Sequence, residues 1–126
     1  MSGNKVMLDT NALGPYLDGK FAKEYVKPKE VISISIISKL EFLSNPELTP
    51  KNRFFFEEFC KYIEIYSVTK ENVDLINQVI SIRKKHKLKL PDAIIAATAV
   101  INNATLFSAD DVFSKVYNLK FQLIKV

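Results

Sequence analysis

The chain has 126 residues, of which 48% are hydrophobic and 25% charged; this composition is that of an ordinary globular protein and excludes a disordered or low-complexity chain. With three glycines and a single cysteine, Cys60, the chain has no glycine-rich phosphate loop, internal disulfide or cysteine-based zinc cluster. The net charge of +4 favours a polyanionic partner such as nucleic acid, although solubility alone explains such a charge equally well.

Short apolar runs alternate with helical patterns along the chain. Strands are predicted at residues 5–8, 31–37, 62–68, 105–108 and 121–124. Loops are predicted at residues 26–30 and 45–50, where proline and polar residues gather.

Two helices are predicted between the later strands. The first covers about 69–87, with Thr69 as its N-cap, and its helical spacing predicts buried side chains at Val73, Ile76, Val79, Ile80 and Ile82. The second covers about 91–103 and is apolar on nearly every side, with a face made of Ala93, Ala96, Ala97, Val100 and Ile101. We therefore expect it to be buried, with small alanines that allow close packing on a sheet.

Strands that alternate with helices predict an α/β fold with a parallel sheet covered on both faces. The length predicts one domain over residues 1–126. No apolar stretch approaches the ~20 residues of a membrane span, and the first residues lack a signal-peptide pattern, so we expect a cytoplasmic protein.

Four acidic residues follow strands or open the buried helix: Asp9, Glu41, Asp92 and Asp110. Each has a purely structural explanation. Asp9 and Asp110 can cap helices, Asp92 can complement a helix dipole, and Glu41 can lie on a helix surface.

Considered together, the four acids favour a site. The carboxyl ends of parallel strands meet at one edge of the sheet, where open α/β folds place their ligands. Carboxylates gathered there without basic partners raise one another's pKa and favour a divalent cation. Because all the ligands are oxygens, Mg²⁺ or Mn²⁺ is expected rather than zinc, and metal-assisted hydrolysis is the indicated reaction class.

The chain has few residues suited to other catalytic mechanisms. The single histidine, His86, lies in a basic run over residues 83–89, and Cys60 lies in an apolar and aromatic stretch, so neither suits nucleophilic catalysis. The basic run either follows a phosphate backbone or complements a helix C-terminus. The aromatic residues 54–56, with Phe59 and Tyr62, form either core or a protein–protein surface.

Four segments resemble the motifs of PIN-domain ribonucleases, most closely the VapC toxins of type II toxin–antitoxin modules. Residues 6–11 (VMLDTN) are similar to the first motif, and residues 35–42 (SIISKLEF) to the second. Residues 91–99 (PDAIIAATA) give the most specific match, and residues 106–113 (LFSADDVF) resemble the fourth motif. The resemblance covers nearly the whole chain.

This resemblance implies a three-layer α/β/α fold and a Mg²⁺- or Mn²⁺-dependent endoribonuclease. Its catalytic and metal-binding carboxylates would be Asp9, Glu41, Asp92 and Asp110. The groups that orient them would be Thr10, Asn11, Ser108 and Asp111, and the choice between Asp110 and Asp111 as the fourth acid stays open. RNA (transfer or ribosomal RNA in such toxins), an antitoxin that blocks the pocket and a second copy in a homodimer would be the partners.

Three alternatives stay open from the sequence. The chain could be a catalytically silent PIN-like module that binds RNA or protein, although such modules usually lack one or more of the acids. It could be a metal-dependent hydrolase of DNA, since the carboxylates do not distinguish ribose from deoxyribose. It could also be a PIN nuclease of RNA processing or decay without an antitoxin.

Overall fold

The computed structural model describes residues 4–20, 25 and 30–125. Within these residues the strands are β1 (Lys5–Leu8), β2 (Val31–Ser35), β3 (Glu64–Tyr66), β4 (Thr105–Ser108) and β5 (Lys120–Leu123). The helices are α1 (Thr10–Leu17), α2 (Ile36–Leu43), α3 (Pro50–Cys60), α4 (Val73–His86), α5 (Leu90–Ile101) and the 3₁₀ helix η1 (Asp111–Lys115). Among the described residues, none of the helices is long and apolar enough to cross a bilayer.

The five strands form one parallel sheet in the order β3-β2-β1-β4-β5. The chain builds one half of the sheet outward from β1 to β3, then crosses back through α4 and α5 and places β4 on the other side of β1. The strand order therefore reverses between β1 and β4. In open α/β sheets this reversal point is where ligands bind, beyond the carboxyl ends of the strands.

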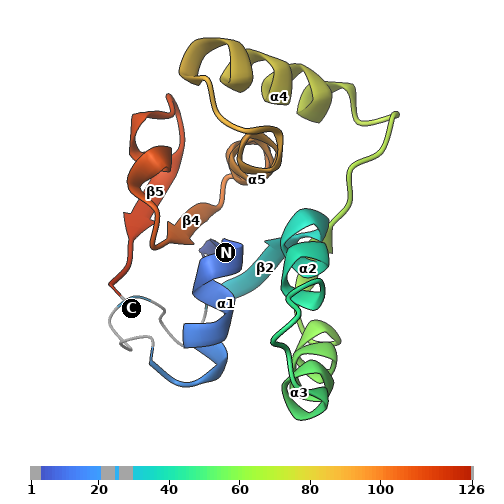
Figure 1. The fold of residues 1–126 in the computed structure, drawn as a ribbon. Coiled ribbons are helices and arrows are strands. Elements are labelled where there is room, and N and C mark those ends of the chain that lie inside the picture. The colour runs from blue at the N-terminus through green and yellow to red at the C-terminus, as the bar shows by residue number, and fades with distance from the viewer. Residues whose placement is uncertain (1–3, 21–24, 26–29, 126) are drawn as a thin grey trace.

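Helices cover both faces of the sheet, which gives the three-layer α/β/α architecture that the sequence predicted. Side chains alternate along β1, so Met7 packs in a core with α4 and α5, whereas Val6 and Leu8 pack in a second core with α1 and α3. Figure 1 shows α4 and α5 above the sheet and α1 below it. The alanine face of α5 is buried, as predicted: Ala93, Ala96 and Ala97 are fully inaccessible to solvent.

Polar residues set the starts of the helices. The Asp9 carboxylate caps α1, the Ser35 hydroxyl caps α2 by accepting from the Ile37 amide at 3.1 Å, and Thr49 caps α3. Ser35 is also the last residue of β2, so the chain passes from strand to helix without a loop. For this reason the prediction of a strand as far as residue 37 was wrong by two residues.

The bounds of four other elements also differ from the prediction. The strand at 62–68 shortens to β3, and the one at 121–124 begins and ends one residue earlier. Helix α4 begins at Val73, because Asn72 rather than Thr69 provides the cap, accepting from the Leu75 amide at 3.2 Å. Helix α5 begins at Leu90, one residue before the predicted start.

Three side chains predicted to be buried are exposed: Val73 by 58%, Ile80 by 47% and Ile101 by 37%. The helical spacing identified an apolar surface correctly, but this chain alone does not cover all of it. Residues 26–29 of one predicted loop lie outside the described residues, and the other loop ends at Thr49, because Pro50 begins α3.

Candidate active site

The four acids singled out in the sequence lie around the point where the strand order reverses. Asp9 follows β1, Asp110 follows β4, and these two strands are neighbours in the sheet. Asp92 lies in the first turn of α5, and Glu41 lies on α2, which follows β2 directly. We call these four residues the acidic edge. The capping and dipole roles proposed for Asp9, Asp110 and Asp92 also hold, so these positions serve both purposes.

Asp9 is the buried member of the acidic edge, with 6% of its surface exposed. Its Oδ1 accepts from the Thr10 amide and its Oδ2 from the Ser108 hydroxyl, both at 2.8 Å. Ser108 ends β4, so this second bond joins the two strands at the reversal point. The bonds fix the orientation of the carboxylate without neutralising it.

Two neighbours predicted to orient the acids do contact the site. The Thr10 hydroxyl donates to Glu41 Oε1 at 2.5 Å, which connects α1 to α2. The Asn11 Oδ1 atom accepts from the Ala109 amide at 2.9 Å and from the Ser108 hydroxyl at 3.3 Å. Asn11 therefore holds the segment between β4 and η1 against α1.

Two carboxylates of the acidic edge, Asp9 and Asp92, have a raised pKa. Burial, together with the charges of Asp92 and Glu41, raises the pKa of Asp9 to about 6, although the bonds from Ser108 and Thr10 oppose this rise. Burial, followed by the charges of Asp110 and Glu41, also raises the pKa of Asp92, while Lys89 lowers it. Desolvation and like charges both disfavour ionisation of a carboxylate. Holding Asp9 and Asp92 ionised therefore costs free energy in the absence of a cation.

Asp110 and Asp111, the two candidates for the fourth acid, are both exposed but have different neighbours. Asp110 is among the charges that raise the pKa of Asp92, whereas Asp111 is not. The Asp110 carboxylate also caps η1 by accepting from the Val112 amide at 3.0 Å, and its own amide donates to the Ser108 hydroxyl at 3.0 Å. Asp111 is an exposed residue in the first turn of η1.

The donor set fits a divalent cation in kind: four carboxylates supply only oxygen ligands and an excess of negative charge. The four carboxylates do not, however, all point toward one common metal position. Among the described residues, no group of three acidic, histidine or cysteine side chains surrounds a common point at metal-binding distance. Three of the carboxylates instead accept hydrogen bonds from their own surroundings, at Thr10, Ser108 and Val112.

Two features of this region were missed in the sequence. Ser38 lies one helical turn before Glu41, is fully buried, and its hydroxyl has no hydrogen-bond partner within the described part of the chain. A serine three residues before an acid on an apolar helix was the available signal. The other feature is Lys89, whose charge reaches Asp92, so the acids are not wholly without a basic neighbour.

The remaining candidates lie elsewhere. His86 is the last residue of α4, and its Nε2 accepts from the Tyr117 amide at 3.5 Å. Burial raises the pKa of the Cys60 thiol, which disfavours the reactive thiolate. The aromatic run fits neither of the two alternatives alone: Phe56 is buried, whereas Phe54, Phe55 and Tyr62 are exposed by 60%, 53% and 85%.

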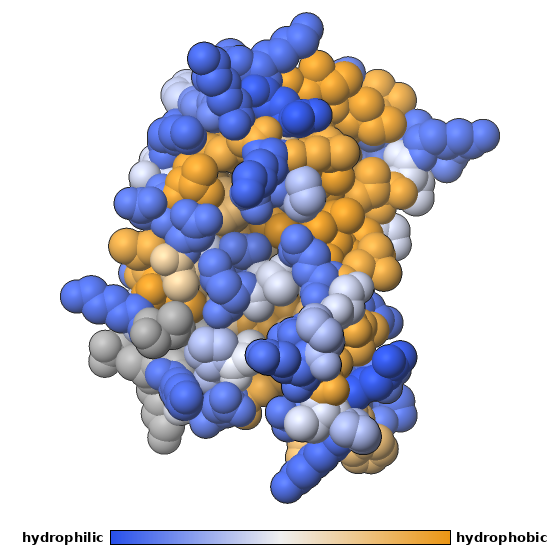
Figure 2. All heavy atoms as spheres, viewed as in Figure 1, coloured by the Kyte–Doolittle hydropathy of each residue, from blue (hydrophilic) through white to orange (hydrophobic). Residues whose placement is uncertain are grey.

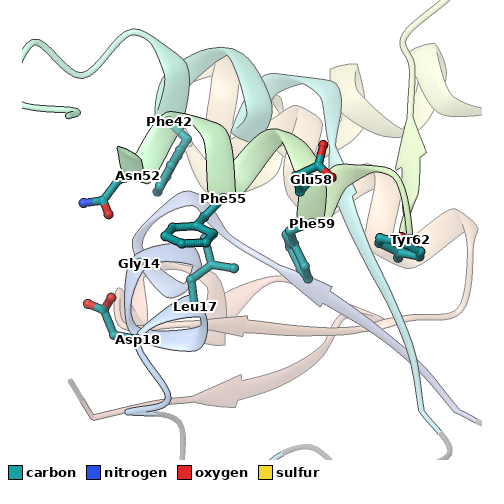
Figure 3. Close-up of a pocket in the computed structure, with 9 residues that line it drawn as sticks. All are labelled: Gly14, Leu17, Asp18, Phe42, Asn52, Phe55, Glu58, Phe59 and Tyr62. Atoms are coloured by element: carbon teal, nitrogen blue, oxygen red, sulfur yellow. The ribbon is translucent and has the colours of Figure 1, made fainter. Parts of the chain in front are cut away.

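An apolar hollow of about 510 Å³ lies between α1 and α3. Figure 3 shows the rings of Phe55 and Phe59 extending from α3 toward α1, where Leu17 lies. We call this feature the apolar hollow; its lining residues are Gly14, Leu17, Asp18, Phe42, Asn52, Phe55, Glu58, Phe59 and Tyr62.

Comparison with known proteins defines the class. The family model for the PIN domain matches residues 6–119, so the chain belongs to the PIN domain family, as its motifs predicted. No curated protein matches the chain in sequence. Membership of this family supports a hydrolase that acts on nucleic acids.

Solved structures with the same fold come from toxin–antitoxin systems. VapBC2 from Rickettsia felis, bound to a DNA fragment from its promoter, matches with a TM-score of 0.78 and 20% identity, over 96% of this chain and 99% of that one. A toxin–antitoxin complex from Klebsiella pneumoniae matches with a TM-score of 0.72 and 25% identity, over 90% and 94% of the two chains. VapBC-5 from Mycobacterium tuberculosis matches with a TM-score of 0.67 and 18% identity, over 97% and 98%.

Proposed function

We propose that this protein is a Mg²⁺- or Mn²⁺-dependent endoribonuclease that acts in the cytoplasm as the toxin of a VapBC-type module. Asp9, Glu41, Asp92 and Asp110 are its catalytic carboxylates. The observation that carries the proposal is the gathering of these acids at the strand reversal of a PIN-domain sheet, where burial and the charges of neighbouring acids raise the pKa of Asp9 and of Asp92. Family membership supports the nuclease, and the toxin–antitoxin structures support the biological role.

The residues divide the chemistry between them. Asp9, Asp92 and Asp110 would hold the cation with Glu41, and the bound cation supplies charge neutralisation and an acidified water at neutral pH. Ser108 and the Thr10 amide fix the Asp9 carboxylate, and the Thr10 hydroxyl steadies Glu41. Asp92 or Glu41 would orient the attacking water. The oxygen of this water bonds to phosphorus as the bond to the 3′-oxygen breaks, and the proton that the water loses balances the one that the departing 3′-oxygen gains.

Cleavage of single-stranded RNA in Mn²⁺ by paired variants tests the proposal. Asp92→Asn removes one charge of the acidic edge and is expected to lower the cleavage rate by roughly 10³-fold, the loss typical of removing one electrostatic catalytic group. The matched control is Asp74→Asn, because Asp74 is also an acid in the first turn of a helix, α4, but is exposed and outside the site. It is expected to cleave at the wild-type rate.

Two outcomes would contradict the proposal. Normal RNA cleavage by a folded Asp92→Asn protein would contradict the assignment of Asp92 to the active site. Calorimetry of Mn²⁺ binding to Asp92→Asn and Asp74→Asn tests the same assignment without depending on cleavage. If the wild-type protein cleaved DNA of the same sequence as efficiently as RNA, the proposed RNA specificity would be wrong, whereas the proposed metal-dependent hydrolysis would still hold.

The apolar hollow supports the proposal of an antitoxin partner. Three of its aromatic side chains, Phe55, Phe59 and Tyr62, come from α3 or the turn after it, and two of them are more than half exposed. Aromatic residues are enriched at protein interfaces. An apolar segment of the antitoxin would fill this hollow, while Asp18 and Glu58 at its lining would favour a basic residue beside it.

Co-purification with the small protein encoded by the adjacent reading frame tests this partner. Phe55→Ser with Tyr62→Ser is expected to weaken the complex, whereas Phe54→Ser is the control, since Phe54 is equally exposed but does not line the hollow. Equal co-purification by both proteins would exclude the hollow as the contact.

Exposed apolar side chains on α2, α4 and α5 support the proposal of a homodimer. Leu40, Val73, Ile80 and Leu90 are each between 47% and 58% exposed, and Figure 2 shows apolar residues gathered on the viewed face from α4 down to α2. Sedimentation equilibrium of the wild type and of Leu40→Asp measures the mass. A monomeric wild type would contradict the proposal.

A further inference from the structure

A second hollow, of about 470 Å³, lies at the C-terminal end of α4 and is lined by cations. We call it the basic hollow; its lining residues are Ile80, Arg83, Lys84, Lys87 and Leu88. Figure 2 shows hydrophilic residues gathered in the upper left of the viewed face, where Figure 1 places this end of α4. None of the three cations forms an ion pair with any residue in the described ranges.

Complementing the helix C-terminus does not account for all of these charges. Arg83 does serve that purpose, because its Nε donates to the Leu88 carbonyl at 3.3 Å. Lys84 and Lys87 are exposed and make no side-chain hydrogen bond within the described residues. Lys87 is the C-cap of α4 and has a left-handed backbone with a φ of 55°, which a lysine adopts at a conformational cost.

An exposed aromatic residue, Tyr117, belongs to a segment that contacts His86, the residue before Lys87. The Tyr117 amide donates to His86 Nε2 at 3.5 Å, which places the segment after η1 against the residue that precedes Lys87. The Tyr117 side chain is 71% exposed. A cationic groove with an aromatic side chain at its border is the arrangement that binds single-stranded nucleic acid, with phosphates on the cations and a base stacked on the ring.

The basic hollow and the acidic edge are close along the chain. Lys87 and Asp92 are five residues apart, so their Cα atoms lie at most ~18 Å from each other. Lys89, between them, is close enough to act on the Asp92 carboxylate. A single strand held in the basic hollow therefore has a phosphodiester within a short reach of the acids.

We propose that the basic hollow binds the sugar–phosphate backbone of single-stranded RNA and that Tyr117 stacks on one of its bases. This inference rests on the proposed ribonuclease function and names the surface that holds the strand beside the cleaved bond. The exposed aromatic ring favours RNA over an acidic protein segment, because stacking on a base uses its face and an acidic segment does not.

Binding of a fluorescent single-stranded RNA in EDTA, over a range of KCl concentrations, tests the inference without cleavage. The variant Lys84→Gln/Lys87→Asn removes two cations, and asparagine tolerates the left-handed backbone at position 87. Its affinity is expected to fall roughly tenfold, and its salt dependence to weaken by about 1.4 in the log–log slope, since each lost phosphate contact contributes about 0.7.

Two matched controls accompany it. Lys70→Gln/Lys125→Gln removes the same charge at exposed positions before α4 and after β5, and is expected to keep the wild-type slope. Tyr117→Ala is expected to lose about tenfold in affinity with an unchanged slope, whereas Tyr117→Phe keeps the affinity, because stacking needs the ring and not the hydroxyl.

The outcomes separate this inference from the proposed function. Equal slopes for the two double variants, in a protein that cleaves RNA in Mn²⁺, overturn the inference alone. A reduced slope for Lys84→Gln/Lys87→Asn in a protein that never cleaves supports the RNA surface and contradicts the nuclease. Loss of binding to poly-glutamate in that variant, with RNA binding unaffected by Tyr117→Ala, identifies a docking site for an acidic protein and overturns the inference.

Discussion

The acidic edge and the apolar hollow are made of different residues of the same small domain, and each costs free energy for a different reason. The acidic edge gathers charge: Asp9 is 6% exposed, and Asp92 and Glu41 both act on its carboxylate. The apolar hollow exposes hydrophobic surface, including more than half of Phe55 and of Tyr62. The first loses free energy through repulsion and desolvation, and the second through contact of apolar area with water.

This difference separates the two regions experimentally. Changes of pH or of divalent cation act on charged groups and are expected to alter the acidic edge, whereas apolar surface responds to neither. Substitutions in the α1–α3 core are expected to alter the hollow and to leave cation binding intact. The four predictions below test that separation, beginning with the largest effect.

Phe56→Ala should break the apolar region. Phe56 is fully buried, and its ring centroid lies 4.3 Å from that of Phe42, which lines the hollow. Removing a buried phenyl ring typically lowers the free energy of unfolding by about 3–5 kcal/mol. Urea denaturation measures the loss, and Phe56→Leu provides a milder variant should the first fail to fold. Mn²⁺ affinity that fell with Phe56→Leu would show that the two regions are coupled.

Divalent cation should stabilise the acidic edge. At a Mn²⁺ concentration one hundred times the dissociation constant, binding to the folded state alone contributes about 2.7 kcal/mol. Thermal melts with and without Mn²⁺ measure the gain, which Asp74→Asn should retain and Asp92→Asn should largely lose. An identical gain in both variants would place the cation elsewhere.

Asp9→Asn should stabilise the cation-free protein near pH 7. Since one pKa unit corresponds to about 1.4 kcal/mol, a rise in the Asp9 pKa from 3.8 to about 6 means that ionising the folded protein costs up to about 3 kcal/mol. Asparagine keeps the bond from the Thr10 amide and avoids this cost, so we expect a gain of about 2 kcal/mol.

The sign of the pH dependence follows from the same shift. Between pH 4 and 6 the folded state holds the Asp9 proton and the unfolded state does not, so wild-type stability falls as the pH rises through this window. The advantage of Asp9→Asn should therefore be largest above pH 6 and vanish below about pH 4. Urea denaturation in EDTA at several pH values measures it, and a constant advantage would contradict the assigned cause.

Phe55→Ser with Tyr62→Ser should change stability least, by less than about 0.5 kcal/mol, because both side chains are largely exposed. Their replacement should nevertheless reduce binding of a fluorescent apolar dye, since it removes part of the lining of the hollow. Dye binding that changed with pH or with Mn²⁺ would contradict the expectation that the apolar hollow responds to neither.

The sequence predicted the layers of the fold well because strand and helix periods differ and all five strands are short runs that are apolar or alternate between apolar and polar residues. The prediction of element boundaries failed where the same sequence pattern is compatible with two different local structures. The run after Val31 is apolar on both sides of Ser35, so only the capping bond to the Ile37 amide shows that the strand ends there. Thr69 and Asn72 are both good N-caps, and nothing local chooses between them.

The nearness of the candidate acids was predictable from the sequence, but the hydrogen bonds that hold them were not. The positions of Asp9, Asp92 and Asp110 at strand ends and at a helix start indicated that they would meet. The bond between Thr10 and Glu41 joins residues 31 apart, and that between Ser108 and Asp9 joins residues 99 apart, so neither could be inferred from spacing. The exposure of Val73 and Ile80 was missed because helical periodicity shows which side is apolar and not whether the chain covers it.

The bond between Ser108 and Asp9 also determines when this edge of the protein can exist during synthesis. Strand β1 is central, with β2 on one side and β4 on the other, and the second neighbour is made 99 residues after Asp9. At 5–20 residues added per second, a ribosome needs roughly 5–20 s to pass from one partner to the other. Until then Asp9 has no Ser108 beside it, so the nascent chain carries an incomplete site for most of its translation.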